Sequence, residues 1–136
     1  MTTHNDRSAV RVLGGAFVLA LLAVVCWWAF LGWDTTYDVD PVTGSTTGPY
    51  GVPQVAGCVL VLVALTAAGA SKLPAWLAVA AVALPFTAAW STWAARHDAS
   101  GLWAVGAALV LIGTVAGGGL VAAVTRFVLK RQSVRV

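Results

Sequence analysis

Residues 102–125 read LWAVGAALVLIGTVAGGGLVAAVT, an apolar run that contains no charged side chain. A helix that crosses the hydrocarbon core of a bilayer, about 30 Å thick, needs about 20 mostly apolar residues. This run meets that requirement, and residues 12–33, 52–70 and 73–95 meet it in the same way. The sequence therefore predicts four membrane-spanning helices.

The composition of the whole chain excludes most other classes of protein. Of its 136 residues, 60% are hydrophobic and only 10% are charged, whereas a soluble domain carries about 25% charged residues. The chain has too few polar groups to cover a water-soluble globule and is too apolar to be disordered. Its basic residues lie at the ends of apolar runs rather than in a stripe, which argues against a nucleic-acid partner. The apolar runs also lack the alternation of barrel strands.

The predicted fold is therefore all-α: an integral membrane four-helix bundle that forms a single membrane domain. The two tails are residues 1–11 and 126–136, and an outer loop of residues 34–51 joins the first two helices. The second connection is a tight turn before Pro74, since proline suits the first turn of a helix. In the third connection, Ser100 is a candidate N-cap of the last helix.

Lys and Arg are distributed unevenly between the two sides of this four-span arrangement. Seven of the eight fall on the side of the chain termini, and only Arg96 falls on the other. The seven are Arg7, Arg11, Lys72, Arg126, Lys130, Arg131 and Arg135. Because cytoplasmic segments of membrane proteins are enriched in Lys and Arg, we expect both termini in the cytoplasm and the protein in the cell membrane. The four C-terminal residues of this set either determine topology alone or also bind anionic lipid headgroups.

The outer loop contains the most informative polar segment, YDVDPVTGSTTGPY at residues 37–50. Pro41 presets one backbone angle of a turn, and Gly44 can adopt positive φ. Residues 36–40 and 45–47 on either side favour extended structure, so we expect a short hairpin. The loop aspartates lack the spacing of a calcium-binding loop, which favours a solvated acidic turn.

This loop resembles one found in small uncharacterised four-helix membrane proteins of high-GC Gram-positive bacteria. The resemblance covers the element Tyr37-x-x-Asp40-Pro41-x-Thr43-Gly44, the following Gly48-Pro49-Tyr50, and Gln54. It extends to about 20 residues and the four-span layout, and it implies no particular activity.

Cys26 and Cys58 fall at similar depths in the first two predicted spans, about 10 Å from the outer boundary at 1.5 Å per residue. Adjacent antiparallel helices can bring such residues together. They form either a disulfide or two small buried thiols.

Small residues recur on one face of two predicted helices. The last helix carries Gly106, Gly113 and Gly117, and the second carries Gly57, Ala64 and Ala68 at the same offsets. Small residues let membrane helices approach closely, so we expect the two faces to pack against each other or against another copy of the chain. In the third helix, Pro85 removes one backbone N–H and predicts a kink, with Thr87 and Ser91 available for compensating hydrogen bonds.

The sequence contains no zinc-type spacing, nucleophile elbow or phosphate-binding loop, so we expect no enzyme, metal or cofactor site. The spans also lack the Asp, Glu, Lys, Arg or His that ion-coupled transport ordinarily uses. These absences favour a non-catalytic accessory or interaction subunit that contacts the lipid bilayer and either a membrane-protein partner or a second copy. The alternative is a small homo-oligomeric transporter or channel for an uncharged or weakly polar solute.

Overall fold

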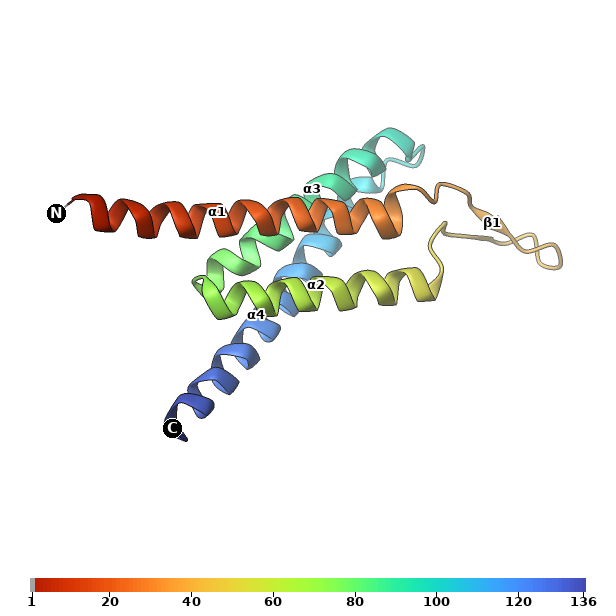
Figure 1. Cartoon of the computed structure of the whole chain (residues 1–136). Helices are drawn as coiled ribbons and strands as arrows, with labels where there is room; N and C mark the ends of the chain where they lie inside the picture. Colours follow the sequence, from red (N-terminus) through yellow and green to blue (C-terminus); the bar gives the residue numbers. More distant parts are fainter. Residues whose placement is uncertain (1) are drawn as a thin grey trace.

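The structure, a computed structural model, describes residues 2–136, with side chains from residue 5 onward, so Met1 of the predicted tail lies outside it. Four helices account for most of the chain (Figure 1). They are α1 (Thr2–Trp27), which continues into the π-helical turn η1 (Trp28–Gly32), α2 (Val52–Lys72), α3 (Ala75–His97) and α4 (Trp103–Val134). All four are long and apolar enough to cross a membrane, as the sequence predicts.

The first and last helices are longer than the predicted spans. Residues 2–11 and 126–134, predicted as tails, continue α1 and α4 without interruption. These segments contain neither proline nor glycine, so no residue in them ends the helix at the membrane boundary. The basic side chains they carry therefore lie on helical extensions of α1 and α4.

The helices cross one another rather than forming a parallel array. In Figure 1, α1 and α2 lie side by side and antiparallel, while α3 and α4 run obliquely across them. Both chain termini and the turn between α2 and α3 lie at one end, called here the terminal end. The loop between α1 and α2 and the turn between α3 and α4 lie at the other, called the hairpin end. Because four helices carry the chain back and forth between the two ends, it begins and finishes at the same end.

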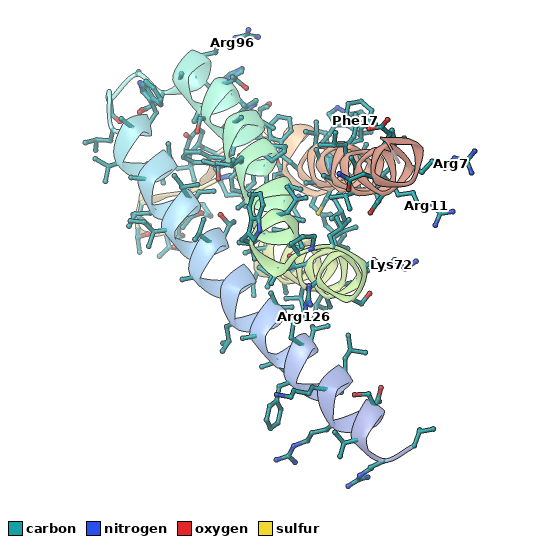
Figure 2. All side chains as sticks on the ribbon, turned by 90° about the vertical axis from the view of Figure 1, so that its left-hand side faces the viewer. Arg7, Arg11, Phe17, Lys72, Arg96 and Arg126 are labelled. Atoms are coloured by element: carbon teal, nitrogen blue, oxygen red, sulfur yellow. The ribbon has the colours of Figure 1, made fainter. Side chains whose placement is uncertain are left out.

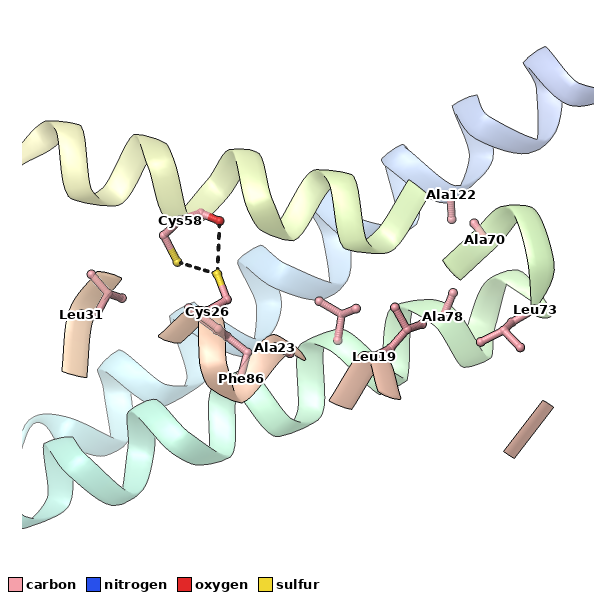
Figure 3. Packing of buried hydrophobic residues seen from close by; sticks show 11 residues of the cluster. Leu19, Ala23, Cys26, Leu31, Cys58, Ala70, Leu73, Ala78, Phe86 and Ala122 are labelled. Carbon is pink, nitrogen blue, oxygen red and sulfur yellow. Dashed lines mark hydrogen bonds between the residues drawn. The ribbon is translucent and has the colours of Figure 1, made fainter. Parts of the chain in front are cut away.

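The fully buried positions of the bundle hold small side chains, which pack among a few larger ones such as Leu19 and Phe86 (Figure 3). Ala23, Ala70 and Ala78 are fully buried, whereas Phe17 and Leu120 are 65% and 68% exposed. In water this distribution would be unfavourable, because large apolar side chains contribute most when they are buried. In lipid it is expected, since small residues let the helices approach and large ones face the acyl chains.

The predicted hairpin is present at the tip of the outer loop. Strands β1 (Asp38–Val39) and β2 (Thr46–Thr47) pair antiparallel, with Asp38 opposite Thr47. Gly44 has φ +66°, as the turn requires, and its N–H donates to the Asp40 carbonyl at 2.9 Å. The Asp40 carboxylate accepts the Val42 N–H at 2.8 Å. This hydrogen bond, with a smaller contribution from the Thr43 hydroxyl, lowers the pKa of the Asp40 carboxyl group.

The start of α4 is capped differently from the sequence prediction. Ser100 is not the N-cap residue, although its hydroxyl accepts the Leu102 N–H at 3.3 Å. Asp98 instead accepts the N–H of Trp103, the first helical residue, at 2.6 Å through Oδ2. Its other oxygen accepts the Ser100 N–H at 2.8 Å. The carboxylate reaches further than a serine hydroxyl, and as an anion it interacts favourably with the positive end of the helix dipole.

Candidate functional site: the groove between α2 and α4

A groove separates α2 from α4, and α3 forms its floor. It encloses about 340 Å³. Val55, Val59 and Val63 line it from α2, and Leu109, Gly113 and Gly117 line it from α4. Val82, Phe86 and Trp90 line it from α3. The groove follows α4 from Leu109 to Val121, which corresponds to about 18 Å at 1.5 Å per residue.

The glycines of α4 divide into packed and open positions. A Cβ added at Gly106 would lie 2.5 Å from the Trp90 ring, and one at Gly118 would lie 3.3 Å from Val79. A Cβ added at Gly113 or Gly117 would meet nothing within 4 Å. Gly106 and Gly118 therefore let α4 approach α3, whereas Gly113 and Gly117 present bare backbone to the groove.

The small-residue faces of α2 and α4 do not pack against each other, which corrects one of the two expected arrangements. A Cβ added at Gly57 would lie 2.6 Å from Phe30 of η1, so this residue faces the first helix rather than α4. Ala64 is exposed, and Ala68 lines a second cavity that α2 shares with α1. α2 meets α4 instead near Thr66, whose methyl group would lie 3.8 Å from a Cβ added at Gly118. Packing of these faces against another copy stays a prediction.

The threonine hydroxyl groups in the groove are already engaged by their own helices. The hydroxyl groups of Thr66 and Thr114 donate to the carbonyl groups of Leu62 and Val110, at 2.8 and 2.7 Å. Among the residues that line the groove there is no carboxylate, imidazole or amine. The groove therefore offers shape and apolar contact.

Gln54 joins the start of α2 to η1, the π-helical turn that continues α1, at the hairpin end of the molecule. Its side-chain oxygen accepts the Gly51 N–H at 2.7 Å, which stabilises the start of α2. Its amide nitrogen donates to Asp34 Oδ2 at 3.1 Å and to the Phe30 carbonyl at 3.4 Å. The π-helical geometry of η1 breaks the regular α-helical hydrogen-bond ladder at Phe30, which leaves this carbonyl able to accept. The glutamine three residues after Gly51 is a visible capping signal, but the sequence does not reveal its partners on η1.

Tyr50 closes the hairpin end of the groove. Its hydroxyl group is buried without a hydrogen-bond partner among residues 5–136. Burial, with smaller contributions from Tyr37 and Asp34, raises the pKa of Tyr50 to about 12. Its ring lies 6.1 Å from that of Trp93, which stacks on His97 at 4.8 Å. These rings form an aromatic rim above the apolar groove.

Cys26 and Cys58 lie side by side, as their depth in the sequence suggested (Figure 3). Their sulfur atoms are 3.7 Å apart, both residues are buried, and neither is in a disulfide. The Cys26 thiol also donates to the Cys58 carbonyl at 3.8 Å. A disulfide requires an S–S distance of about 2.05 Å, so its formation needs only a small approach of the two sulfurs.

Pro85 lies within α3, which continues through it as an α-helix. The Thr87 hydroxyl, a candidate for a compensating hydrogen bond, is buried and has no partner among the described residues. The predicted kink at Pro85 stays a prediction.

The basic residues of α4 differ in their surroundings. The Arg126 guanidinium donates to the Leu73 carbonyl at 2.6 Å and so ties α4 to the turn between α2 and α3. Arg131 lies over the Phe127 ring at 4.4 Å, and Lys130 and Arg135 are exposed. Arg126 therefore has a structural partner that the sequence did not reveal, whereas the lipid contacts of the other three residues stay a prediction.

The described residues contain no cluster of three or more His, Cys, Asp or Glu side chains that could hold a metal ion. The resemblance of the outer loop to that of small bacterial membrane proteins stays a prediction. No protein-family model, curated protein or solved structure matches the chain.

Proposed function

We propose that this chain is a non-catalytic interaction subunit that holds a transmembrane helix of another membrane protein in the groove between α2 and α4. The observation that carries the proposal is the open backbone of Gly113 and Gly117, where an added Cβ would meet nothing within 4 Å. In lipid, helices associate where small residues allow close backbone approach. The face of α4 that carries Gly113 and Gly117 lines a groove about three helical turns long.

The low burial of α4 within the bundle supports an additional partner on this helix. In the most apolar part of α3, 33% of the residues are buried within the bundle, but only 6% are buried in α4. A Cβ added at Gly113 or Gly117, two of the glycines that make α4 suitable for close packing, would meet none of the described residues within 4 Å. A partner helix would give this face the contacts that it lacks.

The shape of the groove favours a helix from a different protein over a second copy. In a two-fold pair, Gly113 and Gly117 of α4 would meet the same residues of the other copy. The α2 wall, where Val55 and Val59 are 44% and 51% exposed, would then remain uncovered. A single helix lying along the groove contacts both walls.

A photo-crosslinking amino acid placed at Val59 or Leu109, one on each wall, tests this proposal. We expect both positions to form an adduct of the same mass in native membranes. Leu120 is 68% exposed but does not line the groove, so it serves as a matched control position that should not form this adduct.

A second set of variants tests whether the adduct depends on the groove. Gly113→Leu and Gly117→Leu should abolish it, because the new side chains occupy the space of the partner. Gly119→Leu should preserve it, since Gly119 is equally open but lies outside the groove. An adduct of twice the chain's own mass would contradict the proposal and favour the homo-oligomeric transporter, as would measurable solute flux in proteoliposomes. An adduct that forms equally at Leu120, or that survives Gly117→Leu, would also contradict it.

We further infer that the chain lies in the cell membrane with its termini in the cytoplasm. Support comes from the distribution of charge, because the terminal end carries seven of the eight Lys and Arg residues. Figure 2 views the molecule from this end, with Arg7, Arg11 and Lys72 on α1 and α2, which are seen nearly end-on, and Arg126 part-way along α4 beside the end of α2. Such asymmetry is typical of cytoplasmic segments.

A further inference from the structure

A second cavity lies between α1 and α2 at the terminal end and encloses about 520 Å³. Its floor and walls are apolar, and two basic side chains lie among its lining residues, Arg11 from α1 and Lys72 from α2. The remaining residues that line it are glycines or carry apolar side chains. The cavity therefore combines cations with an apolar surface.

Glycines shape this cavity. A Cβ added at Gly69 would lie 2.6 Å from Leu19, and one at Gly15 would lie 3.2 Å from Leu73, so the two helices meet closely at its floor. A Cβ added at Gly14 would meet nothing within 4 Å. The backbone at Gly14 is therefore open toward the cavity, with room for a ligand of several atoms.

The two cations lie on the same side of the molecule. Figure 2 shows the side chains of Arg11 and Lys72 extending together from the ends of α1 and α2, with Arg7 beside them. Arg7 precedes Arg11 by four residues and so shares its helix face. The next cation on this end, Arg126, already donates to the Leu73 carbonyl.

No carboxylate lines the cavity, so none neutralises these cations there. Four of the five acidic residues belong to connections at the hairpin end: Asp34, Asp38, Asp40 and Asp98. The fifth, Asp6, is five residues from Arg11 and therefore turned about 140° away from it around the helix. An anion would find two positive side chains and no acidic one among the lining residues.

We propose that this cavity binds one anionic phospholipid, with the phosphodiester between Arg11 and Lys72 and an acyl chain along the apolar wall from Gly14 to Leu19. Basic pockets between membrane helices are suited to anionic headgroups. The apolar wall beneath the cations favours a lipid over free phosphate, because only a lipid has hydrocarbon to place there. This site is distinct from the groove between α2 and α4 and does not depend on its function.

Native mass spectrometry of the full chain, delipidated in detergent and titrated with phosphatidylglycerol or phosphatidylcholine, tests the proposal. We expect one phosphatidylglycerol to bind in preference to phosphatidylcholine. Combined Arg11→Gln and Lys72→Gln substitutions should weaken this binding roughly thirtyfold, from about fivefold for each charge. Lys130→Gln combined with Arg135→Gln removes the same charge outside the cavity and should leave binding within about twofold. Equal weakening in both double variants would overturn the proposal in favour of diffuse attraction.

A second variant tests the cavity without changing its charge. Gly14→Leu should weaken phosphatidylglycerol binding roughly tenfold, which corresponds to the lost burial of about two methylene groups. Gly119→Leu, equally open but on α4, should have no effect, and both variants should retain the wild-type circular dichroism spectrum. Unchanged binding by Gly14→Leu would overturn the proposal. Tight phosphatidylcholine binding, or displacement of phosphatidylglycerol by millimolar inorganic phosphate, would overturn the assignment to an anionic lipid.

Discussion

At the residue scale, the charged and amide side chains that cap helices or join them lie near the boundaries of the predicted spans. Gln54 joins the start of α2 to η1, Asp98 caps α4, and Arg126 binds the carbonyl group of Leu73. The hydroxyl groups of Thr66, Thr114 and Thr125 within the helices donate to their own backbone, because hydrocarbon supplies no alternative partner. The Ser100 hydroxyl, followed by backbone N–H groups, lowers the pKa of the Asp98 carboxyl group and keeps the cap anionic. The side-chain hydrogen bonds that join or cap helices therefore lie where water or lipid headgroups are close.

The paired thiols lead to a prediction at this scale. Treatment of the membrane-embedded protein with a membrane-permeant thiol oxidant should join Cys26 to Cys58, because their sulfur atoms already lie 3.7 Å apart. Intact-protein mass spectrometry should show the loss of two hydrogen atoms and complete protection from alkylation after unfolding. The Cys58→Ala variant should show neither change. If both thiols of the oxidised wild-type protein remained alkylatable, the side-by-side arrangement would be wrong.

The sequence alone predicts the residues whose structural role depends only on their neighbours in the chain. Pro41 and Gly44 were predicted to form the turn of the hairpin, and Gly44 has the expected positive φ. The contacts of Gln54 with Asp34 and Phe30 were not predicted, because they depend on how η1 lies against α2. The sequence does not predict the Asp98 cap, because Ser100 lies closer to the start of the helix and the Asp98 carboxylate reaches the Trp103 N–H only through the conformation of the connecting turn.

At the scale of elements, the glycines of α4 divide into those that hold the bundle together and those that leave it open. Gly106 is in the first group, because an added Cβ would lie 2.5 Å from Trp90. We expect Gly106→Leu to lower the free energy of unfolding in detergent by about 1–3 kcal/mol through overpacking.

Gly119→Leu is the control for this prediction, since an added Cβ there meets nothing within 4 Å. Its free energy of unfolding should stay within about 0.5 kcal/mol of the wild-type value. Thermal unfolding followed by circular dichroism compares the two variants. Equal stability of Gly106→Leu and Gly119→Leu would show that Trp90 does not pack on α4 as described.

Helical periodicity was sufficient to find the small-residue faces but not their neighbours. The offsets of seven and eleven residues put Gly106, Gly113 and Gly117 on one face. Because α4 crosses α3 obliquely, that face meets Trp90 at one end and the open groove further along. Crossing angles arise from the combined packing of all four helices, so one helix's pattern does not determine them.

At the scale of the whole molecule, the four helices and the separation of charge follow from the same physical cause. Hydrocarbon selects long apolar helices, and the transfer of Lys and Arg across a membrane is unfavourable. The spans could therefore be predicted from the sequence, while η1 and the helical continuation of both tails could not. The hydrocarbon boundary limits where apolar residues are needed, but it does not end a helix.

Topology can be tested by labelling single cysteines in a variant that carries Cys26→Ala and Cys58→Ala. With Thr43→Cys added in the hairpin turn, a membrane-impermeant maleimide should label intact cells. With Ser133→Cys near the end of α4, labelling should require permeabilisation, because we expect this end in the cytoplasm. Labelling of Ser133→Cys but not Thr43→Cys in intact cells would reverse the proposed orientation.

The apolar part of α4, residues 103–125, is about 35 Å long at 1.5 Å per residue, which exceeds the roughly 30 Å hydrocarbon core of a bilayer. A helix with this excess tilts further when the bilayer becomes thinner and stands more upright when it thickens. α4 packs on α3 at Gly106 and Gly118, and Arg126 ties it to the turn between α2 and α3, so a change in its tilt would move mainly its hairpin-end half relative to α2. We therefore expect the width of the opening between α2 and α4 to vary with membrane thickness, so that lipids of different chain length would adjust how readily the proposed partner helix enters.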